Sequence, residues 1–197
     1  MPQVSEKYLE KRRNSIAKSA INVFARKGYS NASMKDIINE AEVSRGGLYA
    51  HFANIDAVFI AALKYDDSIQ AIPLLEPNIK DSFLTQLKNW IYQVILSSLE
   101  KNNLIRAKSE FFLSHSAKEV PYLQERRENL SQSIQQFIQL GITEGAFKKE
   151  IDLASFSDLL ISMMDGVMLH QYNQYSPNTD ILNILTQMDK VLESYLT

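Results

Sequence analysis

The segment Ser44–Phe52, which reads SRGGLYAHF, places an arginine, a tyrosine and a histidine around two adjacent glycines. All three polar side chains can donate hydrogen bonds to phosphate oxygens, and an arginine also reaches O6 and N7 of guanine with two parallel bonds. Gly46 and Gly47 each weaken a helix by roughly 0.5–1 kcal/mol relative to alanine. Because a glycine lets another molecule approach the backbone closely, the pair indicates a surface that meets a partner at short range. The chemistry of this segment predicts contact with nucleic acid.

The elements around this segment are typical of a helix-turn-helix. Ser33 is a favourable N-cap for a short helix over the next eight residues, MKDIINEA, and Ser44 is one for a second short helix. A longer helix is expected before them, from about residue 11 to residue 27. In a helix-turn-helix the second helix enters the major groove with its amino-terminal residues against the base edges. The two glycines then let the backbone of this recognition helix lie close to DNA.

The predicted DNA contacts combine base recognition with phosphate binding. We expect Arg45 to reach a base edge or a phosphate, and Tyr49 and His51 to donate to phosphates. The capped starts of the two short helices offer backbone N–H groups to anions. The alternatives are a half-buried core position for Tyr49, a solvated surface position for His51, and a merely solvated basic cluster at residues 11–13. The predicted DNA-binding residues are Arg12, Arg13, Ser33, Lys35, Ser44, Arg45, Gly46, Gly47, Tyr49 and His51.

Charge divides the chain into two parts. The 197 residues carry a net charge of −2, but residues 1–64 hold ten Lys or Arg against six Asp or Glu, which gives +4. The remaining residues hold eleven against seventeen, which gives −6. A basic head on an acidic body favours a small polyanion-binding module joined to a part with another task. The alternative is that the charges are unevenly distributed by chance.

Composition and hydropathy predict a cytoplasmic protein. No cysteine is present, which excludes disulfides and thiolate metal sites and fits a reducing compartment. The amino terminus lacks the apolar stretch of a signal peptide. The longest apolar run, Ala57–Leu63, has seven residues, far fewer than the ~20 that span a bilayer. We therefore expect a soluble protein without a membrane partner.

Apolar residues recur at spacings of three and four, which is typical of helices and not of strands. We predict an all-α fold of about nine helices. The expected parts are a helix-turn-helix DNA-binding domain over residues 1–53 and a helical ligand-binding and dimerisation domain over residues 54–197.

The residue patterns of catalytic sites are missing from the sequence. The three histidines, His51, His115 and His170, lie far apart, and no H-E-x-x-H, P-loop or G-x-S-x-G pattern occurs. We expect neither an enzyme nor a bound metal or cofactor.

Residues 12–60 resemble the TetR family of bacterial transcriptional regulators. The helix ending in FARKGY, the S-x-x-D-I-x-x-x-A helix and the segment VSRGGLYAHF occur there in the family's order. The resemblance implies a homodimer that binds a palindromic double-stranded operator, normally represses transcription, and is released by a small-molecule effector. A transcriptional activator of the same fold and a ligand-independent DNA-binding protein are the alternatives.

Three positions depart from the pattern of the family. Glu42 stands where the turn usually has glycine, which implies left-handed strain of roughly 1–2 kcal/mol if the backbone is kept. Ile55 replaces a lysine that meets phosphate in many members, so that contact is not expected here. Gly47 stands where relatives often have threonine, which weakens the transfer of a base contact to this position.

We expect the domain over residues 54–197 to supply the dimer interface and the effector site. The helices over residues 153–172 and 179–196 are apolar on more than one side, so we expect a four-helix bundle with their copies unless they are fully internal. The expected interface residues are Phe156, Leu160, Val167, Ile181, Leu185, Met188 and Leu192. Aromatic and methionine side chains suit an apolar or amphipathic effector. The expected pocket residues, each with plain core as its alternative, are Trp90, Tyr92, Phe111, Phe112, His115, Met163, Met164 and Met168.

The helix expected over residues 54–70 is the predicted link between effector and DNA. It follows the recognition helix directly, and its apolar run can pack against both head and body. Effector binding is expected to move its carboxy-terminal end and to change the spacing of the two recognition helices. Because major-groove half-sites lie about 34–36 Å apart, a shift of the heads prevents both from binding at once.

Overall fold

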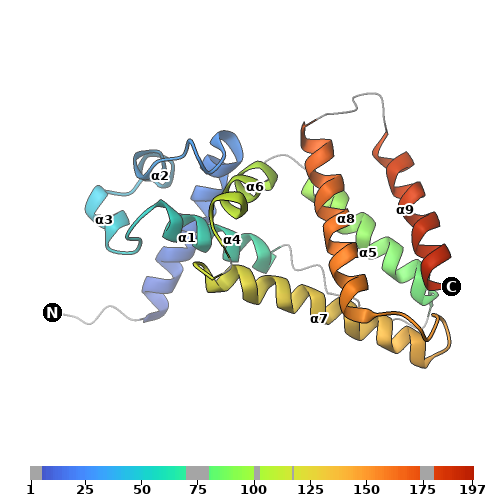
Figure 1. The fold of residues 1–197 in the computed structure, drawn as a ribbon. Coiled ribbons are helices and arrows are strands. Elements are labelled where there is room, and N and C mark those ends of the chain that lie inside the picture. Colours follow the sequence, from blue (N-terminus) through green and yellow to red (C-terminus); the bar gives the residue numbers. More distant parts are fainter. Residues whose placement is uncertain (1–5, 70–79, 100–102, 117, 174–179) are drawn as a thin grey trace. The chain divides into compact units, whose positions relative to one another are not determined.

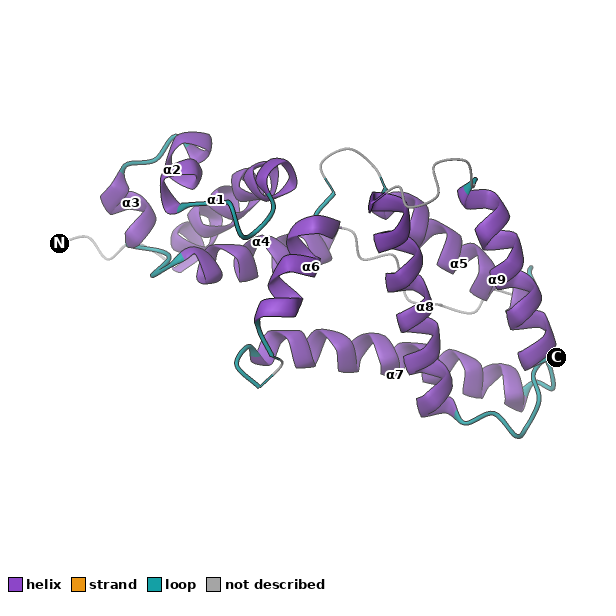
Figure 2. Ribbon diagram, turned by 45° about the horizontal axis from the view of Figure 1, so that its top comes forward, coloured by secondary structure: helices purple, strands orange, loops and turns teal. Residues whose placement is uncertain are grey.

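The computed structural model of the chain describes residues 6–69, 80–99, 103–116, 118–173 and 180–197. Within these ranges all regular structure is helical, which confirms the predicted all-α fold (Figure 1, Figure 2). None of the helices in the described ranges is both long and apolar enough to span a bilayer. The nine helices of the described residues are α1 (Glu6–Lys27), α2 (Met34–Ala41), α3 (Arg45–Tyr49), α4 (Ile55–Ile69), α5 (Phe83–Ser98), α6 (Ile105–Ser114), α7 (Pro121–Thr143), α8 (Leu153–Asn173) and α9 (Ile181–Leu196).

The helices pack into two compact units. The first, which we call the head, comprises residues 1–71 and 101–116 and holds α1 to α4 together with α6. The second, which we call the body, comprises residues 72–100 and 117–197 and holds α5 and α7 to α9. The segments before residue 101 and after residue 116 therefore belong to the body, although α6 between them belongs to the head. The domain boundary expected after residue 53 stays a prediction, while the packing of α4 and α6 on α1 extends the head beyond that residue.

The head is built around the apolar face of α1. This helix buries one face between Ile16 and Phe24, and α2, α4 and α6 pack against it. The ring of Phe24 meets that of Phe59 on α4 edge-on, with 4.9 Å between centroids, and Phe111 of α6 lies 4.6 Å from the same Phe59 ring. All three side chains are fully buried, and burial of each stabilises the fold by roughly 1.5–3 kcal/mol. This aromatic cluster fixes α6 to the helix-turn-helix.

The first ten residues of α1 extend beyond that core. The helix begins at Glu6, earlier than the start expected near residue 11, and residues 6–15 are all exposed. Packing does not explain a helix there. Glutamate, lysine, leucine and arginine fill much of this stretch, and all are strong helix formers. Glu6 also lies in the first turn, where a negative charge interacts favourably with the helix dipole.

The body is a helical bundle in which α8 packs against α5 and α7, and α9 packs against α5. The inward face of α9 includes Leu185 and Leu192, which are both buried. At the edge of this contact the hydroxyl of Tyr92 on α5 donates a hydrogen bond to Asp189 of α9, at 2.9 Å. The amphipathic faces of the four helices thus close one apolar core.

Candidate nucleic-acid interface

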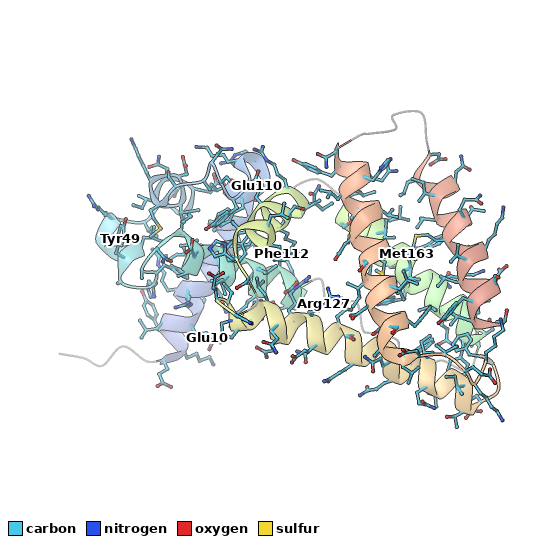
Figure 3. The ribbon with its side chains drawn as sticks, viewed as in Figure 1. Glu10, Tyr49, Glu110, Phe112, Arg127 and Met163 are labelled. Carbon is cyan, nitrogen blue, oxygen red and sulfur yellow. The ribbon has the colours of Figure 1, made fainter. Side chains whose placement is uncertain are left out.

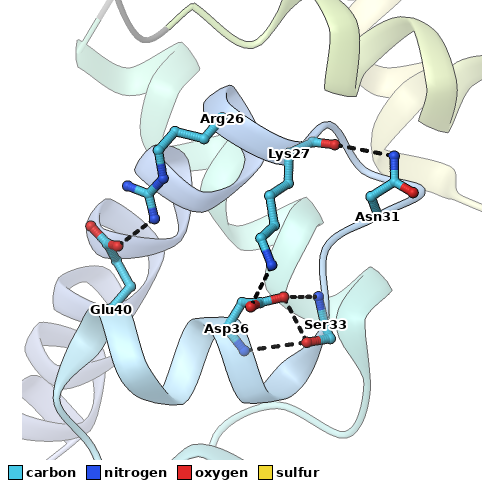
Figure 4. A network of polar contacts seen from close by, with 6 residues as sticks. All are labelled: Arg26, Lys27, Asn31, Ser33, Asp36 and Glu40. Atoms are coloured by element: carbon cyan, nitrogen blue, oxygen red, sulfur yellow. Dashed lines mark hydrogen bonds and ion pairs between the residues drawn. The ribbon is translucent and has the colours of Figure 1, made fainter.

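A capping box fixes the start of α2. The Oγ atom of Ser33 accepts a hydrogen bond from the backbone N–H of Asp36 at 3.3 Å, and the Asp36 carboxylate accepts one from the backbone N–H of Ser33 at 3.0 Å (Figure 4). Lys27 Nζ on α1 lies 2.6 Å from the same carboxylate. Hydrogen bonds from Lys27 and Ser33 lower the pKa of Asp36. Asp36, the aspartate of the S-x-x-D-I-x-x-x-A pattern, thus supplies the negative charge that the start of α2 attracts.

A second ion pair holds the other end of α2 to α1. The guanidinium of Arg26 lies 2.7 Å from the Glu40 carboxylate, and the amide of Asn22 donates to the same group at 3.2 Å. Figure 4 shows Arg26 and Lys27 reaching from α1 to the two carboxylates. The hydrogen bond from Arg26 lowers the pKa of Glu40. Exposed ion pairs add little free energy, so their main effect here is to fix the orientation of α2 on α1.

The turn between α2 and α3 passes through a left-handed backbone at Glu42, with φ 51° and ψ 45°. Among the described residues Glu42 is the only one other than glycine with a positive φ. The backbone N–H of Val43 closes the helix end by donating to the carbonyl of Ile38 at 3.2 Å. Glu42 therefore takes a left-handed backbone that costs a residue other than glycine roughly 1–2 kcal/mol.

The short helix α3 is fixed by a cap and by two buried side chains. Ser44 is its N-cap, as predicted, because its Oγ atom accepts a hydrogen bond from the backbone N–H of Gly47 at 3.0 Å. Leu48 is fully buried, and Phe52, which follows the helix, is buried as well. These two anchors leave the opposite side of α3 exposed to solvent.

The two glycines of α3 have different surroundings. A Cβ atom added at Gly46 would meet no protein atom within 4 Å, so the head itself does not require glycine there. A Cβ atom at Gly47 would lie 3.1 Å from the Oγ atom of Ser44, which caps the helix. The cap at Ser44 therefore favours glycine at position 47. Gly46, by contrast, faces open space from which a partner can reach the backbone.

Arg45 and Tyr49 lie one helical turn apart on the exposed side of α3. The guanidinium carbon of Arg45 is 5.7 Å from the centroid of the Tyr49 ring, within the range of a cation–π interaction. Tyr49 is 46% exposed and lies at the edge of the head (Figure 3), so it is not part of the core. Lys35 on α2 is exposed too, and His51 is half-buried. The exposed side of α3 thus carries a cation and an aromatic hydroxyl beside an uncovered backbone.

The basic cluster on α1 contains two kinds of residue. The Nη1 atom of Arg13 donates a hydrogen bond to the backbone carbonyl of His51 at 3.1 Å. The same guanidinium lies over the ring of Phe52, with 4.6 Å from its carbon to the ring centroid. Both side chains are exposed, and the contacts with His51 and Phe52 are those of Arg13. Arg13 therefore contacts the protein at the end of α3, which sequence analysis did not anticipate.

The polar contacts of α6 within the head were also missed at the sequence level. Glu110 (Figure 3) accepts a hydrogen bond from the backbone N–H of Ser30, in the turn between α1 and α2, at 2.8 Å. Burial raises the pKa of Glu110, but hydrogen bonds from Ser30 and Arg106 outweigh that effect and lower it. Lys108 Nζ lies 2.7 Å from the buried carboxylate of Asp66 on α4. The partners are far apart in the sequence, so no local pattern identifies them.

The eight residues expected to line an effector pocket are divided between the two units. Phe111, Phe112 and His115 lie on α6 or at its end, in the head. Phe111 is fully buried there and stacks on the ring of His115 at 4.1 Å, whereas Phe112 is partly exposed. Trp90 is buried in the body, and its Nε1 atom has no hydrogen-bond partner among the described residues. The body residues of the set are Trp90, Tyr92, Met163, Met164 and Met168, and all contribute to its core or pack on it.

The expected interface residues on α8 and α9 mostly face the core of their own chain. Val167 and Ile181 are half-buried, and the other five are buried within a single chain, so they have little surface to offer a partner: Phe156, Leu160, Leu185, Met188 and Leu192. Both helices also expose apolar side chains. Four of their large apolar side chains are between 44% and 52% exposed, namely Leu159, Leu182, Val191 and Tyr195.

Comparisons with known proteins match both parts of the chain to one family. Residues 16–62 match the family model described as bacterial regulatory proteins, tetR family. Residues 86–181 match the model described as tetracyclin repressor-like, C-terminal domain. The first match contains the whole exposed side of α3 that the structure shows.

Relatives and solved structures agree with the family models. An uncharacterized HTH-type transcriptional regulator of Bacillus subtilis, YfiR, is 24% identical over 85% of this chain and 83% of its own length. The HTH-type transcriptional repressor Rv1474c of Mycobacterium tuberculosis is 38% identical over 34% of this chain and 35% of its own. A TetR-family regulator from Pectobacterium atrosepticum superposes with a TM-score of 0.79 at 18% identity, covering 98% of both chains. The protein belongs to the TetR family of bacterial transcriptional regulators.

Proposed function

We propose that this regulator is a repressor that binds a palindromic operator as a homodimer and leaves it when a small molecule binds the body. The observation that carries the proposal is the exposed side of α3, where Arg45 and Tyr49 flank open space at Gly46. Two copies related by a two-fold axis present two such surfaces, as two major-groove half-sites about 34–36 Å apart require. A relative over about a third of the chain is named a repressor, which supports repression over activation.

The exposed apolar faces of α8 and α9 support the homodimer. Leu182, Val191 and Tyr195 are exposed at the two edges of the buried face of α9. A shallow hollow on α9 is lined by Gln187, Lys190, Val191, Ser194 and Tyr195. Apolar surface of this kind is typical of contacts between protein chains. A two-fold contact through α8 and α9 buries it while leaving the cores of both chains intact.

An apolar or amphipathic effector is the class that fits the body best. Trp90 and Met164 are buried in its core, and the indole N–H of Trp90 has no acceptor among the residues that the structure describes. Methionine side chains adapt to ligands of different shape, and an unpaired indole N–H can donate to a polar group of the ligand. Solved structures with the same fold from Clostridium perfringens and Bacillus halodurans are described as a putative fatty acid metabolism regulator and a fatty acid degradation regulator.

We propose that α4 and α6, which the head holds together, transmit effector binding to the DNA-binding helices. The chain passes between head and body three times, after α4 and on either side of α6. Lys108 joins α6 to Asp66 of α4, and Glu110 joins α6 to the turn between α1 and α2. If effector binding moves the chain where it leaves α4 or where it flanks α6, the movement therefore reaches the helix-turn-helix through these two helices. We infer that α6 shares this task with α4, the only link that the sequence indicated.

The decisive experiment is selection of duplexes from a random DNA pool by the full-length protein. We expect enrichment of one palindrome and an affinity that falls steeply with salt, because phosphate contacts release counterions. A reporter gene placed behind the selected palindrome should be transcribed less when the regulator is present. Failure to enrich any sequence would refute the proposal, and higher transcription would favour an activator of the same fold.

The fluorescence of the single tryptophan provides a screen for the effector. Trp90 is the only tryptophan in the chain, so its fluorescence reports ligand binding in the body core without a label. We expect fatty acids or other amphipathic molecules to change this fluorescence and to lower the affinity for the selected palindrome. If no compound that changes the fluorescence alters DNA binding, the regulator is independent of ligand.

A further inference from the structure

We propose that Arg13 is a positioning residue that holds the recognition helix α3 in the orientation needed to read bases. The inference rests on the DNA-binding function proposed for α3, and it gives Arg13 a task other than a phosphate contact.

The recognition helix cannot keep its conformation unaided. It has five residues, two of which are glycines, and few backbone hydrogen bonds close it, such as that from Ala50 to Gly46 at 3.0 Å. Isolated helices shorter than about 12 residues are not stable in water, and glycine lowers helix stability further. Its position must come from outside contacts. Ser44 caps its amino-terminal end, and Leu48 fixes its middle by burial.

Arg13 holds the carboxy-terminal end of α3. Its Nη1 atom donates to the carbonyl of His51 at 3.1 Å, and its guanidinium covers the ring of the buried Phe52 at 4.6 Å. His51 lies two residues after α3, and a cation near the carboxy-terminal end of a helix interacts favourably with the helix dipole. Arg13 comes from α1, whose next turns are buried in the core of the head. One side chain thus ties the residues that follow α3 to α1, the helix against which α2, α4 and α6 pack.

The two contacts together require a guanidinium. A planar guanidinium stacks on an aromatic ring and donates in its own plane to a carbonyl at the same time. A lysine ammonium keeps the charge but is compact and strongly hydrated, and it lacks the planar fork. Arg13→Lys therefore preserves an electrostatic contact with phosphate while weakening the double contact with His51 and Phe52. This difference separates the positioning task from a phosphate contact.

The test compares Arg13→Lys and Arg13→Gln with Arg12→Gln, a control on the same helix with an exposed side chain. Each full-length variant is titrated at several salt concentrations with the palindrome selected by the unmodified protein and with a scrambled duplex of equal length. All titrations are made below the unfolding transition of every variant. Hydrogen exchange of the amides in residues 45–52 and 34–41 is measured without DNA.

We expect Arg13→Lys to weaken binding of the selected palindrome by about tenfold, as for one lost hydrogen bond to a charged donor. Binding of the scrambled duplex should change by less than about twofold, with the same salt dependence, because non-specific binding comes from phosphates. Exchange should rise in residues 45–52 and stay unchanged in residues 34–41. If Arg12 contacts phosphate, Arg12→Gln should weaken both duplexes alike and lower the salt slope by about 0.9.

Two results would overturn the inference. In the first, Arg13→Lys binds both duplexes like the unmodified protein, with unchanged exchange in residues 45–52. In the second, Arg13→Gln weakens both duplexes equally and lowers the salt slope while Arg13→Lys does not, which identifies a phosphate contact. If the unmodified protein selects no palindrome, the proposed function fails by itself. The exchange measurement still decides whether Arg13 holds α3.

Discussion

Glu110 of α6 accepts a hydrogen bond from the backbone N–H of Ser30, 2.8 Å away, across eighty residues of sequence. The bond ties α6 to the turn between α1 and α2. Gly28 leaves room for the carboxylate, because a Cβ atom there would lie 2.5 Å from Glu110 Oε2, and its φ of 75° favours glycine independently. A helix whose chain neighbours belong to the body is thereby held directly against the helix-turn-helix.

Removal of this carboxylate should weaken the head and the response to effector together. Glu110→Ala leaves the N–H of Ser30 without its acceptor, so we expect the free energy of unfolding to fall by about 1–3 kcal/mol. The effector should also release DNA less efficiently, because α6 no longer pulls on the turn. Thermal unfolding and operator titration with and without effector measure the two effects. Glu10→Ala, on the exposed start of α1 (Figure 3), is the control, and equal behaviour of the two variants would contradict this role.

The head should lose stability in acid through the carboxylates that join its helices. The pKa of Asp36 is lowered by hydrogen bonds from Lys27 and Ser33. A carboxylate whose pKa is lower in the folded state contributes stability that is complete above its unfolded pKa, about 4, and is lost as the pH falls through the folded pKa. We expect Asp36→Asn to be less stable than the unmodified protein at neutral pH and to show a shallower decline below about pH 4. Parallel stability curves across the acid range would refute this assignment.

Local features of the head could be predicted from the sequence. Ser33 and Ser44 act as caps on backbone groups three residues away, so a short pattern of residue types identifies them. Glu42 takes the left-handed backbone that its place in the turn implies. These features depend on neighbours in the chain and not on the rest of the fold.

Contacts between distant segments could not be predicted in this way. The partners of Arg13 and Glu110 lie 38 and 80 residues away, and nothing in the local sequence marks them. In α8 apolar residues lie on more than one side, so the local pattern could not tell which side turns inward. The structure buries Leu160 and exposes Leu159, and only the packing of the whole body decides between them.

Relief of the strain at Glu42 should stabilise the protein. Glycine adopts φ near 51° without steric penalty, so Glu42→Gly should raise the free energy of unfolding by about 1 kcal/mol. Glu42→Ala removes the same charge but keeps the strained backbone, and it should leave stability nearly unchanged. Denaturant unfolding of both variants separates backbone strain from charge. Equal stabilisation by alanine and glycine would show that charge, not strain, is responsible.

The proposed homodimer can be disrupted on the exposed side of α9 without damage to the core. Val191→Glu places a charge on a residue that is half exposed, so we expect a folded protein that sediments as a monomer at micromolar concentration. Leu9→Glu makes the same kind of change on α1 and should leave the dimer intact. A dimer that survives Val191→Glu at unchanged affinity would place the contact elsewhere.

We expect DNA to approach the open backbone at Gly46, and the variant Gly46→Ala measures whether it does. The added Cβ meets nothing within 4 Å in the protein, so alanine should raise the free energy of unfolding by about 0.5–1 kcal/mol through helix propensity. The same methyl group should weaken binding of the selected palindrome, because it holds the helix away from the base edges. Stability and DNA affinity therefore change in opposite directions. A Gly46→Ala variant that binds the palindrome as tightly as the unmodified protein would contradict the claim.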